Sequence, residues 1–359
     1  MRILAHPAFK NRRENPYNAS LCTALAAIPG VTVAEFTNRR VLLERWDIVH
    51  VHWPDTPLQR RSTPSAILYT CVLLARLFWA RLLGAKIVWT VHNLLSHGKT
   101  RPRIEKWLWK SFIPLVDSCI HLSNAGRDMA LKSFPALASK SNAVVPHGHY
   151  RDAYPNNGDR AEARALLGMP ANAPVITFVG QIKAYKNVST LIRCFIEAAH
   201  PSALLLIAGR PGDSTIEADL RTAARRQPRV ITHFGLIPDD RMQLYLNACD
   251  LAVFPYRDIL NSGSAILALS FNRPALVPAR GAMAELQQLS GPGWIYTYEG
   301  DLTGPILSTA LDQSLAASRP PVCDLSALSW QSVAAGTHAA YCTATGRGTP
   351  SAIPEPALA

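Results

Sequence analysis

Short runs of apolar residues recur along the chain and alternate with longer stretches of helical character. The runs are continuous rather than alternating, which is typical of parallel strands that are covered by helices on both faces. The pattern predicts an α/β protein with doubly wound parallel sheets. The predicted strands are 2–5, 31–36, 47–52, 86–92, 118–122, 143–146, 175–180, 203–208, 230–234, 251–255 and 275–278.

The strands form two series, and a chain of 359 residues is long enough for two cores. Residues 150–174 are rich in Asn, Gly, Asp, Ala and Pro and are expected to join the two domains. We therefore expect a Rossmann-like domain over residues 1–150 and a second over 151–342, the latter closed by a helix at 326–342. Residues 343–359 are expected to form a disordered tail.

The net charge of +12 is distributed unevenly. Residues 1–150 contain 20 Lys+Arg and 8 Asp+Glu, whereas residues 151–359 contain 17 of each. This asymmetry indicates that the first half binds something anionic, such as a lipid head group, a lipid diphosphate, an acidic sugar or a nucleic acid. The alternative is a basic surface that serves only solubility.

Cysteine usage and the N-terminal segment favour a cytosolic protein. The seven cysteines are scattered and mostly embedded in apolar runs, as expected of buried, reduced thiols. The segment MRILAHPAF offers no long apolar signal core, so we expect no export.

The apolar segment 65–83 is a candidate for membrane contact. Its uninterrupted apolar part ends at Arg76 after roughly ten residues, and a membrane span needs about twenty. We expect it either to lie on a membrane surface, helped by Lys106, Lys110, Trp107 and Trp109, or to be a buried Rossmann helix.

Polar turns follow three strands of the second series. Asn261-Ser262-Gly263-Ser264 opens a helix, where unpaired N–H groups and the helix dipole favour a phosphate, although the same residues also serve as ordinary N-caps. Gly180 ends another strand and is followed by Lys183 and Lys186, which could neutralise a diphosphate. Arg210, after a third strand, is a further candidate for nucleotide contact. Ligands of open α/β sheets bind at this edge.

This series of motifs resembles the nucleotide-sugar domain of GT-B glycosyltransferases, which implies two Rossmann-like domains facing an interdomain cleft. FVGQIKAYKN is similar to the FVGRLxxxKG element of the large retaining family, and the resemblance implies that Lys186 contacts the donor diphosphate. Gln181 replaces the arginine of that element, and Ile259 and Leu267 stand where the family has two glutamates. This departure weighs against retaining chemistry.

A closer resemblance rests on NPYN (15–18), DIVHVHWPD (47–55), VWTVHNLLSHG (88–98), VVPHGHY (144–150), NSGSAILALSFNRPALVP and GPGWIYTY. The set resembles the inverting β-mannosyltransferases of xanthan- and acetan-type exopolysaccharide biosynthesis, glycosyltransferase family 94. The resemblance implies GDP-mannose as donor and a glucuronic-acid-terminated, polyprenyl-diphosphate-linked oligosaccharide as acceptor. Together with the cysteine usage and the segment 65–83, this leads us to expect a cytoplasmic enzyme associated peripherally with the inner membrane.

Inverting transfer needs one base that takes the proton of the acceptor hydroxyl. Asp55 follows a predicted strand of the first domain and is nominated, with a helix N-cap as its rival role. His92 is an alternative base, as is His97, and a histidine there could also be an acceptor ligand or an ordinary hydrogen-bonding residue. The expected acceptor contacts are Tyr17, Asn18, Trp53, Asn93 and His97, together with His92; Tyr17 or Trp53 could instead belong to the core.

The leaving diphosphate is expected to be neutralised without a metal, because no DxD element is present. The helix dipole, Lys186 and residues 262–264 would serve instead. Asp239-Asp240 is interpreted as a helix start, and the spaced pairs His50/His52 and His147/His149 are weak indications of zinc. Glu285 could bind ribose hydroxyls or stabilise its own helix.

The leading hypothesis is therefore a metal-independent, inverting mannosyltransferase. Two alternatives remain. One, within the same class of enzyme, is a related transferase with another donor, such as UDP-glucuronate; the other, from a different class, is a basic nucleic-acid-binding protein without catalysis. The phosphate-binding turns lie in the neutral half and no nucleic-acid motif accompanies the charge, so no nucleic-acid partner is expected. A catalytically inactive adaptor is a third possibility.

Overall fold

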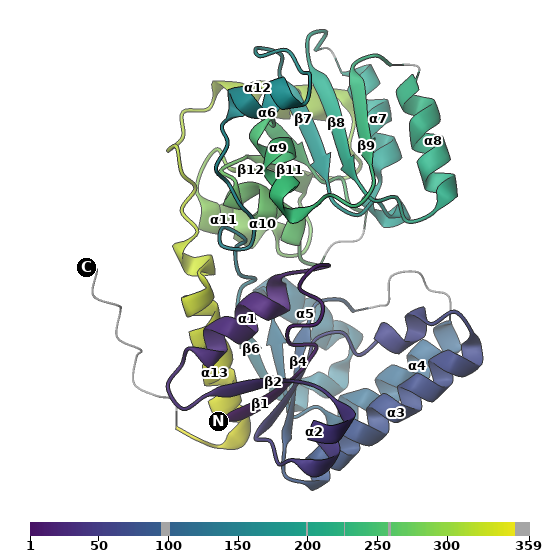
Figure 1. Cartoon of the computed structure of the whole chain (residues 1–359), viewed down its shortest axis with the longest axis vertical. Helices are drawn as coiled ribbons and strands as arrows, with labels where there is room; N and C mark the ends of the chain where they lie inside the picture. Colours follow the sequence, from purple (N-terminus) through teal and green to yellow (C-terminus); the bar gives the residue numbers. More distant parts are fainter. Residues whose placement is uncertain (95–100, 199, 226, 258–259, 349–359) are drawn as a thin grey trace. The chain divides into compact units, whose positions relative to one another are not determined.

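The computed structural model describes residues 1–94, 101–198, 200–225, 227–257 and 260–348. The chain divides into two compact units (Figure 1): unit 1 is Met1–Gly148 with Ala327–Ala359, and unit 2 is His149–Ser326. Each unit contains a six-stranded sheet in which all neighbouring strands are parallel. The predicted α/β class with two doubly wound parallel sheets is confirmed.

Unit 1 has the strand order β2-β1-β3-β4-β5-β6. Its strands are β1 (Arg2–His6), β2 (Thr32–Glu35), β3 (Ile48–Val51), β4 (Lys86–Val91), β5 (Ser118–His121) and β6 (Ser141–Val144). Its helices are α1 (Tyr17–Ala26), α2 (Asn38–Leu43), α3 (Thr63–Leu82), α4 (Pro102–Phe112), α5 (Asn124–Ser133) and α13 (Trp330–Thr345), with short 3₁₀ turns η1 (Thr56–Gln59), η2 (Ile113–Leu115), η3 (Pro135–Ser139) and η6 (Ser326–Leu328).

Unit 2 has the strand order β12-β11-β10-β7-β8-β9. Its strands are β7 (Val175–Val179), β8 (Leu204–Gly209), β9 (Val230–Phe234), β10 (Leu251–Val253), β11 (Ala275–Pro278) and β12 (Ile295–Tyr298). Its helices are α6 (Arg160–Leu166), α7 (Val188–Glu197), α8 (Ser214–Arg225), α9 (Met242–Asn247), α10 (Gly263–Ser270), α11 (Met283–Ser290) and α12 (Gly304–Ala316), with 3₁₀ turns η4 (Ala184–Lys186) and η5 (Asp239–Arg241).

The strand predictions are correct in existence and type, with bounds shifted by up to two residues. The strand β12 was not predicted, although its sequence belongs to the GPGWIYTY stretch. It lies at the edge of the sheet and pairs with β11 alone, and its middle residues are only partly buried. Because this strand is only half covered, its sequence lacks a fully apolar run.

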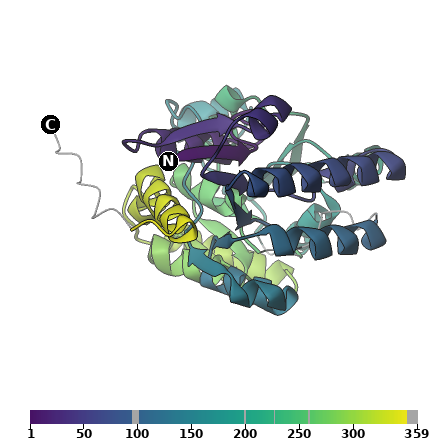
Figure 2. The same ribbon diagram turned by 90° about the horizontal axis from the view of Figure 1, so that it is seen from below.

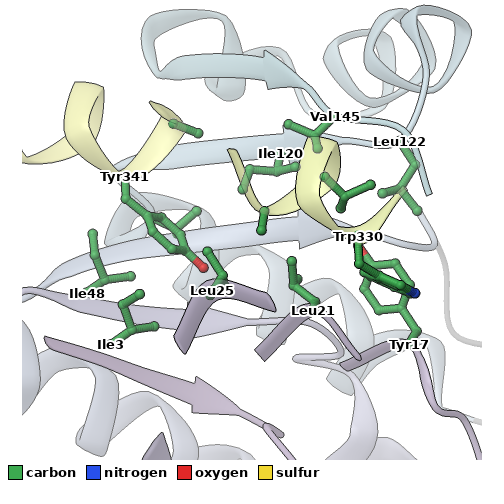
Figure 3. Close-up of a cluster of buried hydrophobic side chains, with 14 residues drawn as sticks. Ile3, Tyr17, Leu21, Leu25, Ile48, Ile120, Leu122, Val145, Trp330 and Tyr341 are labelled. Carbon is green, nitrogen blue, oxygen red and sulfur yellow. The ribbon is translucent and has the colours of Figure 1, made fainter. Parts of the chain in front are cut away.

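Successive residues of β4 serve opposite faces of the unit 1 sheet. Val88 joins the buried cluster beneath α1 and α13, whereas Trp89 packs against Trp109 and Phe112 of α4. This alternation follows from the two-residue period of a strand. Figure 3 shows the first of these clusters, with Tyr17 of α1 beside Trp330 of α13.

The C-terminal helix belongs to unit 1, which corrects the expectation that it closes the second domain. It lies beside α1 in Figures 1 and 2, and its Trp330, Val333 and Tyr341 are buried in the unit 1 cluster. The helix begins and ends three or more residues later than the expected 326–342, and Arg347 beyond it forms an ion pair with Asp47. The expected tail of 343–359 is therefore ordered as far as residue 348, and residues 349–359 lie outside the described ranges.

Unit 1 ends at Gly148, two residues before the expected domain boundary at position 150. All seven cysteines are free, as expected, and six are buried, but Cys71 is exposed on α3. That helix has an apolar outer surface, so the hydrophobic surroundings of Cys71 in the sequence did not indicate burial.

The helix α3 extends over 20 residues, twice the apolar run counted in the sequence. By length and mean hydropathy, 1.4, it could cross a membrane, although 28% of its most apolar window is buried inside the structure. One face packs into unit 1 through Ala66, Thr70, Leu73, Leu77 and Ala80. It is therefore a covering helix of the sheet, and the part of α3 that remains exposed is also apolar.

Two glycines let neighbouring strand ends in unit 2 approach closely. A Cβ atom placed on Gly209 would lie 1.8 Å from the carbonyl oxygen of Gly180, and Gly209 has a φ of +143°. Only glycine combines this conformation with this contact. The pairing of β7 with β8 at the edge where ligands bind therefore depends on Gly209.

We predict that Gly209→Ala destabilises unit 2 by roughly 3 kcal/mol or more, because it adds a steric clash to an unfavourable backbone conformation. Gly235→Ala is the matched control: Gly235 has a φ of +144°, and a Cβ atom added to it would meet no atom within 4 Å, so it reports the backbone term alone. Urea unfolding of both variants measures the difference. Equal losses of stability would show that the close approach is not limiting.

Candidate functional site

Four of the functional residues predicted in unit 1, Trp53, Asp55, His92 and Asn93, lie at the carboxyl edge of its sheet. His52, Trp53 and Asp55 follow β3, and His92 and Asn93 follow β4. The chain crosses from β1 to β2 on one side and from β3 to β4 on the other, so the strand order reverses between β1 and β3. Such a reversal leaves a crevice at the strand ends, where ligands of open α/β sheets bind.

His92 is the centre of this group. Its Nε2 is 3.1 Å from Nδ1 of His52, and its ring stacks on Trp53 with centroids 4.5 Å apart. His52 is buried and its Nε2 has no hydrogen-bond partner in the described structure, whereas His92 is partly exposed. Burial and neighbouring histidines hold the pKa of both rings well below 6.5. Both are therefore neutral at physiological pH, and His92 can accept a proton.

A second layer of hydrogen bonds lies beneath these residues. His50 is bonded through Nε2 to Oγ1 of Thr90 (2.7 Å) and through Nδ1 to the hydroxyl of Tyr341 (2.6 Å). Burial lowers the pKa of His50 to about 3 and that of His147 to about 4. The ring centroid of His50 lies 4.1 Å from that of His52, so the C-terminal helix supports the site through Tyr341.

Tyr17 and Asn18 belong to the interior rather than to an open surface. Tyr17 is 2% exposed and packs against His147, Trp330 and His92, with ring centroids 4.5, 5.5 and 5.0 Å away. Asn18 is fully buried and donates from Nδ2 to the carbonyl of Pro7. Tyr17 is thus a core residue, the alternative left open by the sequence. The acceptor contact expected of Tyr17 is therefore corrected to a supporting role behind the histidines, and that expected of Asn18 to a buried position bonded to Pro7.

Asp55 is buried, at 6% exposure, and occupies the N-cap position of η1. Its carboxylate makes no capping hydrogen bond to that turn, so the rival role proposed from the sequence is not the one observed. Trp53 and Asn93 are partly exposed at the same edge. The remaining candidate, His97, lies outside the described residues.

In unit 2, backbone hydrogen bonds connect four successive strand-end loops. Ile182, after β7, donates to the carbonyl of Arg210, after β8. The N–H of Arg257, after β10, donates to the carbonyl of Tyr185, and that of Ala282, after β11, donates to the carbonyl of Leu260. The strand order reverses between β7 and β10, so these loops surround the crevice of the second sheet.

Lys186 lies in the middle of these loops. It is 9% exposed, and a Cβ atom on Gly180 would lie 3.7 Å from its Nζ. The ammonium lies 5.1 Å from the ring centroid of Tyr256, whose hydroxyl donates to Oγ of Ser264 (2.8 Å). Nζ makes no ion pair with a carboxylate of the described residues, and burial lowers the pKa of Lys186. A buried cation in this state favours an anionic ligand.

The start of α10 faces this region with the residues predicted from the sequence. Ser262 is the N-cap, and its Oγ accepts from the N–H of Ala265 at 3.1 Å. Gly263 begins the helix and Ser264 is connected to Tyr256. Both polar atoms of the Asn261 side chain are buried without a partner among the described residues. Ordinary capping thus accounts for Ser262, but it does not account for Asn261.

The remaining candidates of unit 2 occupy the rim. Arg210 is exposed, and Lys183 is partly exposed at the N-cap position of η4. Glu285 lies in the first turn of α11, where a carboxylate also stabilises its own helix. The hydrogen bond from Ala282 brings the start of α11 to the loop that precedes α10. Either role of Glu285 remains compatible with this position.

The histidine pairs do not form a metal centre in the described ranges, where no group of three or more His, Cys, Asp or Glu side chains could hold a metal ion. His50 and His52 do lie together, as their spacing predicts, but His147 and His149 belong to different units. Asp239 and Asp240 begin the turn η5 before α9, as expected.

Comparison with known proteins gives a consistent result. Residues 173–303 match the family model described as glycosyl transferases group 1. The GDP-mannose:glycolipid 4-beta-D-mannosyltransferase of Xanthomonas campestris pv. campestris is 28% identical over 343 residues, covering 96% of this chain and 92% of that protein. The chain is a GT-B glycosyltransferase.

Solved structures agree with this fold. The sucrose-phosphate synthase of Thermosynechococcus elongatus superposes with a TM-score of 0.64 at 15% identity. The superposition covers 96% of the present chain and 95% of the synthase. HepE of Anabaena, solved in complex with UDP-glucose, superposes with a TM-score of 0.58 at 16% identity. This superposition covers 96% of the present chain and 97% of HepE.

The structure also explains one departure from the family element FVGRLxxxKG. Asn187 occupies the position of its final glycine and has a φ of +58°. Asparagine is among the few other residues that adopt this left-handed conformation readily. Its Oδ1 accepts from the hydroxyl of Thr190 at 2.7 Å, which fixes the start of α7 behind Lys186.

Several residues of both sites were not predicted. Tyr256 lies in the same strand-end loop as the predicted turn 261–264 but was not itself predicted, and the sequence indicates His52 only as a weak zinc ligand. Position after a strand could have indicated Tyr256 and His52. No sequence signal connects Tyr341 with His50, since 291 positions separate them.

Proposed function

We propose that this glycosyltransferase transfers mannose from GDP-mannose to a lipid-linked oligosaccharide, with inversion at the anomeric carbon. The observation that carries the proposal is the buried ammonium of Lys186, which lies above Gly180 at the reversal of the unit 2 sheet without a carboxylate partner in the described structure. The donor is taken from the named activity of the Xanthomonas relative.

Lys186 and α10 suit the leaving diphosphate. In transfer, the bond between the anomeric carbon and the β-phosphate oxygen breaks, and negative charge accumulates on GDP. A buried ammonium and the N-terminus of a helix stabilise that charge most effectively where water is excluded. The unpartnered amide of Asn261 supplies a further hydrogen-bonding group beside them. We therefore assign diphosphate neutralisation to these groups, without a metal ion.

Unit 1 supplies the acceptor side. The oxygen of an acceptor hydroxyl attacks the anomeric carbon while its proton passes to a base. Asp55 and His92 at the edge of the unit 1 sheet are the two candidates, and Trp53 offers an aromatic face for a sugar ring beside His92. Asn93 is partly exposed next to them and is assigned to acceptor binding.

The proposed acceptor is anionic, as a glucuronic-acid-terminated oligosaccharide on polyprenyl diphosphate would be, in exopolysaccharide assembly of the xanthan or acetan type. Unit 1 contains 21 Lys+Arg and 9 Asp+Glu, whereas unit 2 contains 16 of each, so the entire net charge of +12 lies in unit 1. This charge attracts an acceptor that carries a uronate and a diphosphate.

We further propose that the enzyme is cytoplasmic and attaches to the inner face of the membrane through α3. Leu68, Phe78 and Leu82 on its outer face are 60%, 54% and 64% exposed, and Leu43 at the end of α2 is 77% exposed. Exposed apolar side chains beside basic residues are typical of helices that lie in the membrane interface.

The donor assignment predicts that GDP and GDP-mannose raise the melting temperature more than UDP-glucose or UDP-glucuronate, measured by thermal shift. A ligand concentration of a hundred times the Kd adds about 2.7 kcal/mol to the free energy of unfolding. Lys186→Met should weaken GDP binding at least tenfold without lowering the melting temperature of the free protein, because it removes a buried, unpaired cation. Lys132→Met, at an exposed position, is the control. Stabilisation by UDP-sugars alone would reject GDP-mannose as donor.

The base assignment predicts that Asp55→Asn or His92→Gln lowers kcat by about 10²–10⁴-fold with GDP-mannose affinity retained, which is the usual contribution of a general base. If His92 is that base, its low pKa keeps it unprotonated, so kcat stays constant as the pH falls from neutral to 6.5. His121→Gln, at the end of β5, is the control. Normal turnover in both variants would exclude this edge as the source of the base.

Membrane attachment predicts co-sedimentation with phosphatidylglycerol vesicles that weakens as salt is added, because the basic charge contributes. Leu68→Ser with Phe78→Ser should lower the partition coefficient at least tenfold. Ile196→Ser with Leu236→Ser removes two exposed apolar residues of unit 2, 43% and 76% exposed, and serves as control. An equal loss in both double variants would argue against α3.

A further inference from the structure

Unit 1 contains a groove that the proposed chemistry does not use. Its volume is about 800 Å³, and it lies between α4 and the segment formed by the end of α5 and the start of η3. This volume is within the range of roughly 300–1,000 Å³ that is usual for small-molecule sites. The residues of α4 that line it stand at positions 102, 105, 106, 109 and 110, a recurrence at intervals of three and four that places them on one face of the helix.

The lining combines an apolar floor with two cations. Trp109, Ile113, Phe134 and Pro135 are among its apolar lining residues, and Trp109 and Phe134 pack together with ring centroids 5.3 Å apart. Two aromatic rings that pack against each other therefore form part of the wall of the groove.

Lys106 and Lys110 also line the groove and are exposed, and neither forms an ion pair within the described part of the chain. The single carboxylate of the lining, Glu105, is buried and has an interaction of its own. The charge that remains available to a ligand is positive. An occupant that fits this lining combines an apolar part with an anionic group.

We infer that this groove binds the hydrocarbon chain of the lipid-linked acceptor, with Lys106 and Lys110 on its phosphates. The identity of the lipid as acceptor rests on the proposed function. The helices α3 and α4 lie side by side in Figures 1 and 2, so the helix that forms one wall of the groove packs beside the helix with the apolar outer face. A chain held there leaves the lipid partly extracted from the membrane, close to the basic surface of unit 1.

Farnesyl diphosphate is a soluble probe of this chemistry. Titration calorimetry in saturating GDP, which occupies the donor site, should give one binding site per chain. Farnesol and inorganic pyrophosphate should each bind at least tenfold more weakly, because each lacks one half of the ligand. Lyso-phosphatidylglycerol is the comparison for an ordinary membrane lipid. Equal affinity for it would assign the groove to bulk lipid and overturn the acceptor assignment.

Ala136→Trp fills the groove from an exposed position of its lining and should weaken farnesyl diphosphate binding at least tenfold. Ser133→Trp provides a second variant with the same expectation if the first does not fold. Lys106→Gln with Lys110→Gln should have a similar effect, whereas Arg103→Gln with Lys132→Gln removes two exposed charges that do not line the groove and should change affinity less than twofold. Unchanged affinity in the filled variant would refute the site.

Donor and lipid binding can be separated. All groove variants should retain the affinity of the wild type for GDP, since Lys186 and α10 belong to unit 2. Loss of GDP-mannose selectivity with farnesyl diphosphate binding retained would reject the proposed donor and leave the groove intact. Loss of farnesyl diphosphate binding with GDP-mannose selectivity retained would reject the groove alone.

Discussion

The parallel arrangement of the strands determines where this protein can act. In a parallel sheet every strand-end loop leaves from the same edge, and the crossovers run in opposite directions on the two sides of one point in the sheet. In unit 1 that point lies between β1 and β3, and in unit 2 between β7 and β10. His52 and Asp55 follow one side of the first reversal, and Lys186 and Tyr256 lie at the second. The candidate catalytic and ligand-binding side chains therefore gather at these two positions.

The close contact of Gly209 with Gly180 contributes to the burial of the Lys186 ammonium. The glycines allow the strand ends to approach, which brings the loop after β8 against the loop that carries Lys186. Lys186 is then removed from water, and no carboxylate within the described ranges pairs with it to offset the cost. Such an arrangement lowers the stability of the ligand-free protein and raises the affinity for an anion. Stability is thus reduced where binding is needed.

Unit 1 is organised around neutral histidines inside a strongly basic body. His50, His52, His92 and His147 all have lowered pKa values because they are buried among aromatic rings and one another. The positive charge lies instead on lysines and arginines, several of them on α3, α4 and α5. This separation keeps a proton acceptor uncharged within a domain that attracts anions. The apolar face of α3 and the groove beside α4 add the hydrophobic component that a lipid-linked substrate requires.

The sequence by itself determined the two parallel sheets, their strands apart from β12, and the polar turns at residues 180–186 and 261–264, because these are local features with a periodicity or a composition of their own. It could not place the C-terminal helix on unit 1, nor predict the burial of Tyr17 and Asn18. It also could not connect Tyr341 with His50 or show that Lys186 lacks a carboxylate partner in the described structure. These facts depend on contacts between residues far apart in the chain. Only the packed structure decides which polar groups meet a partner and which are left for a ligand, since burial and pairing are properties of surroundings that no short segment contains.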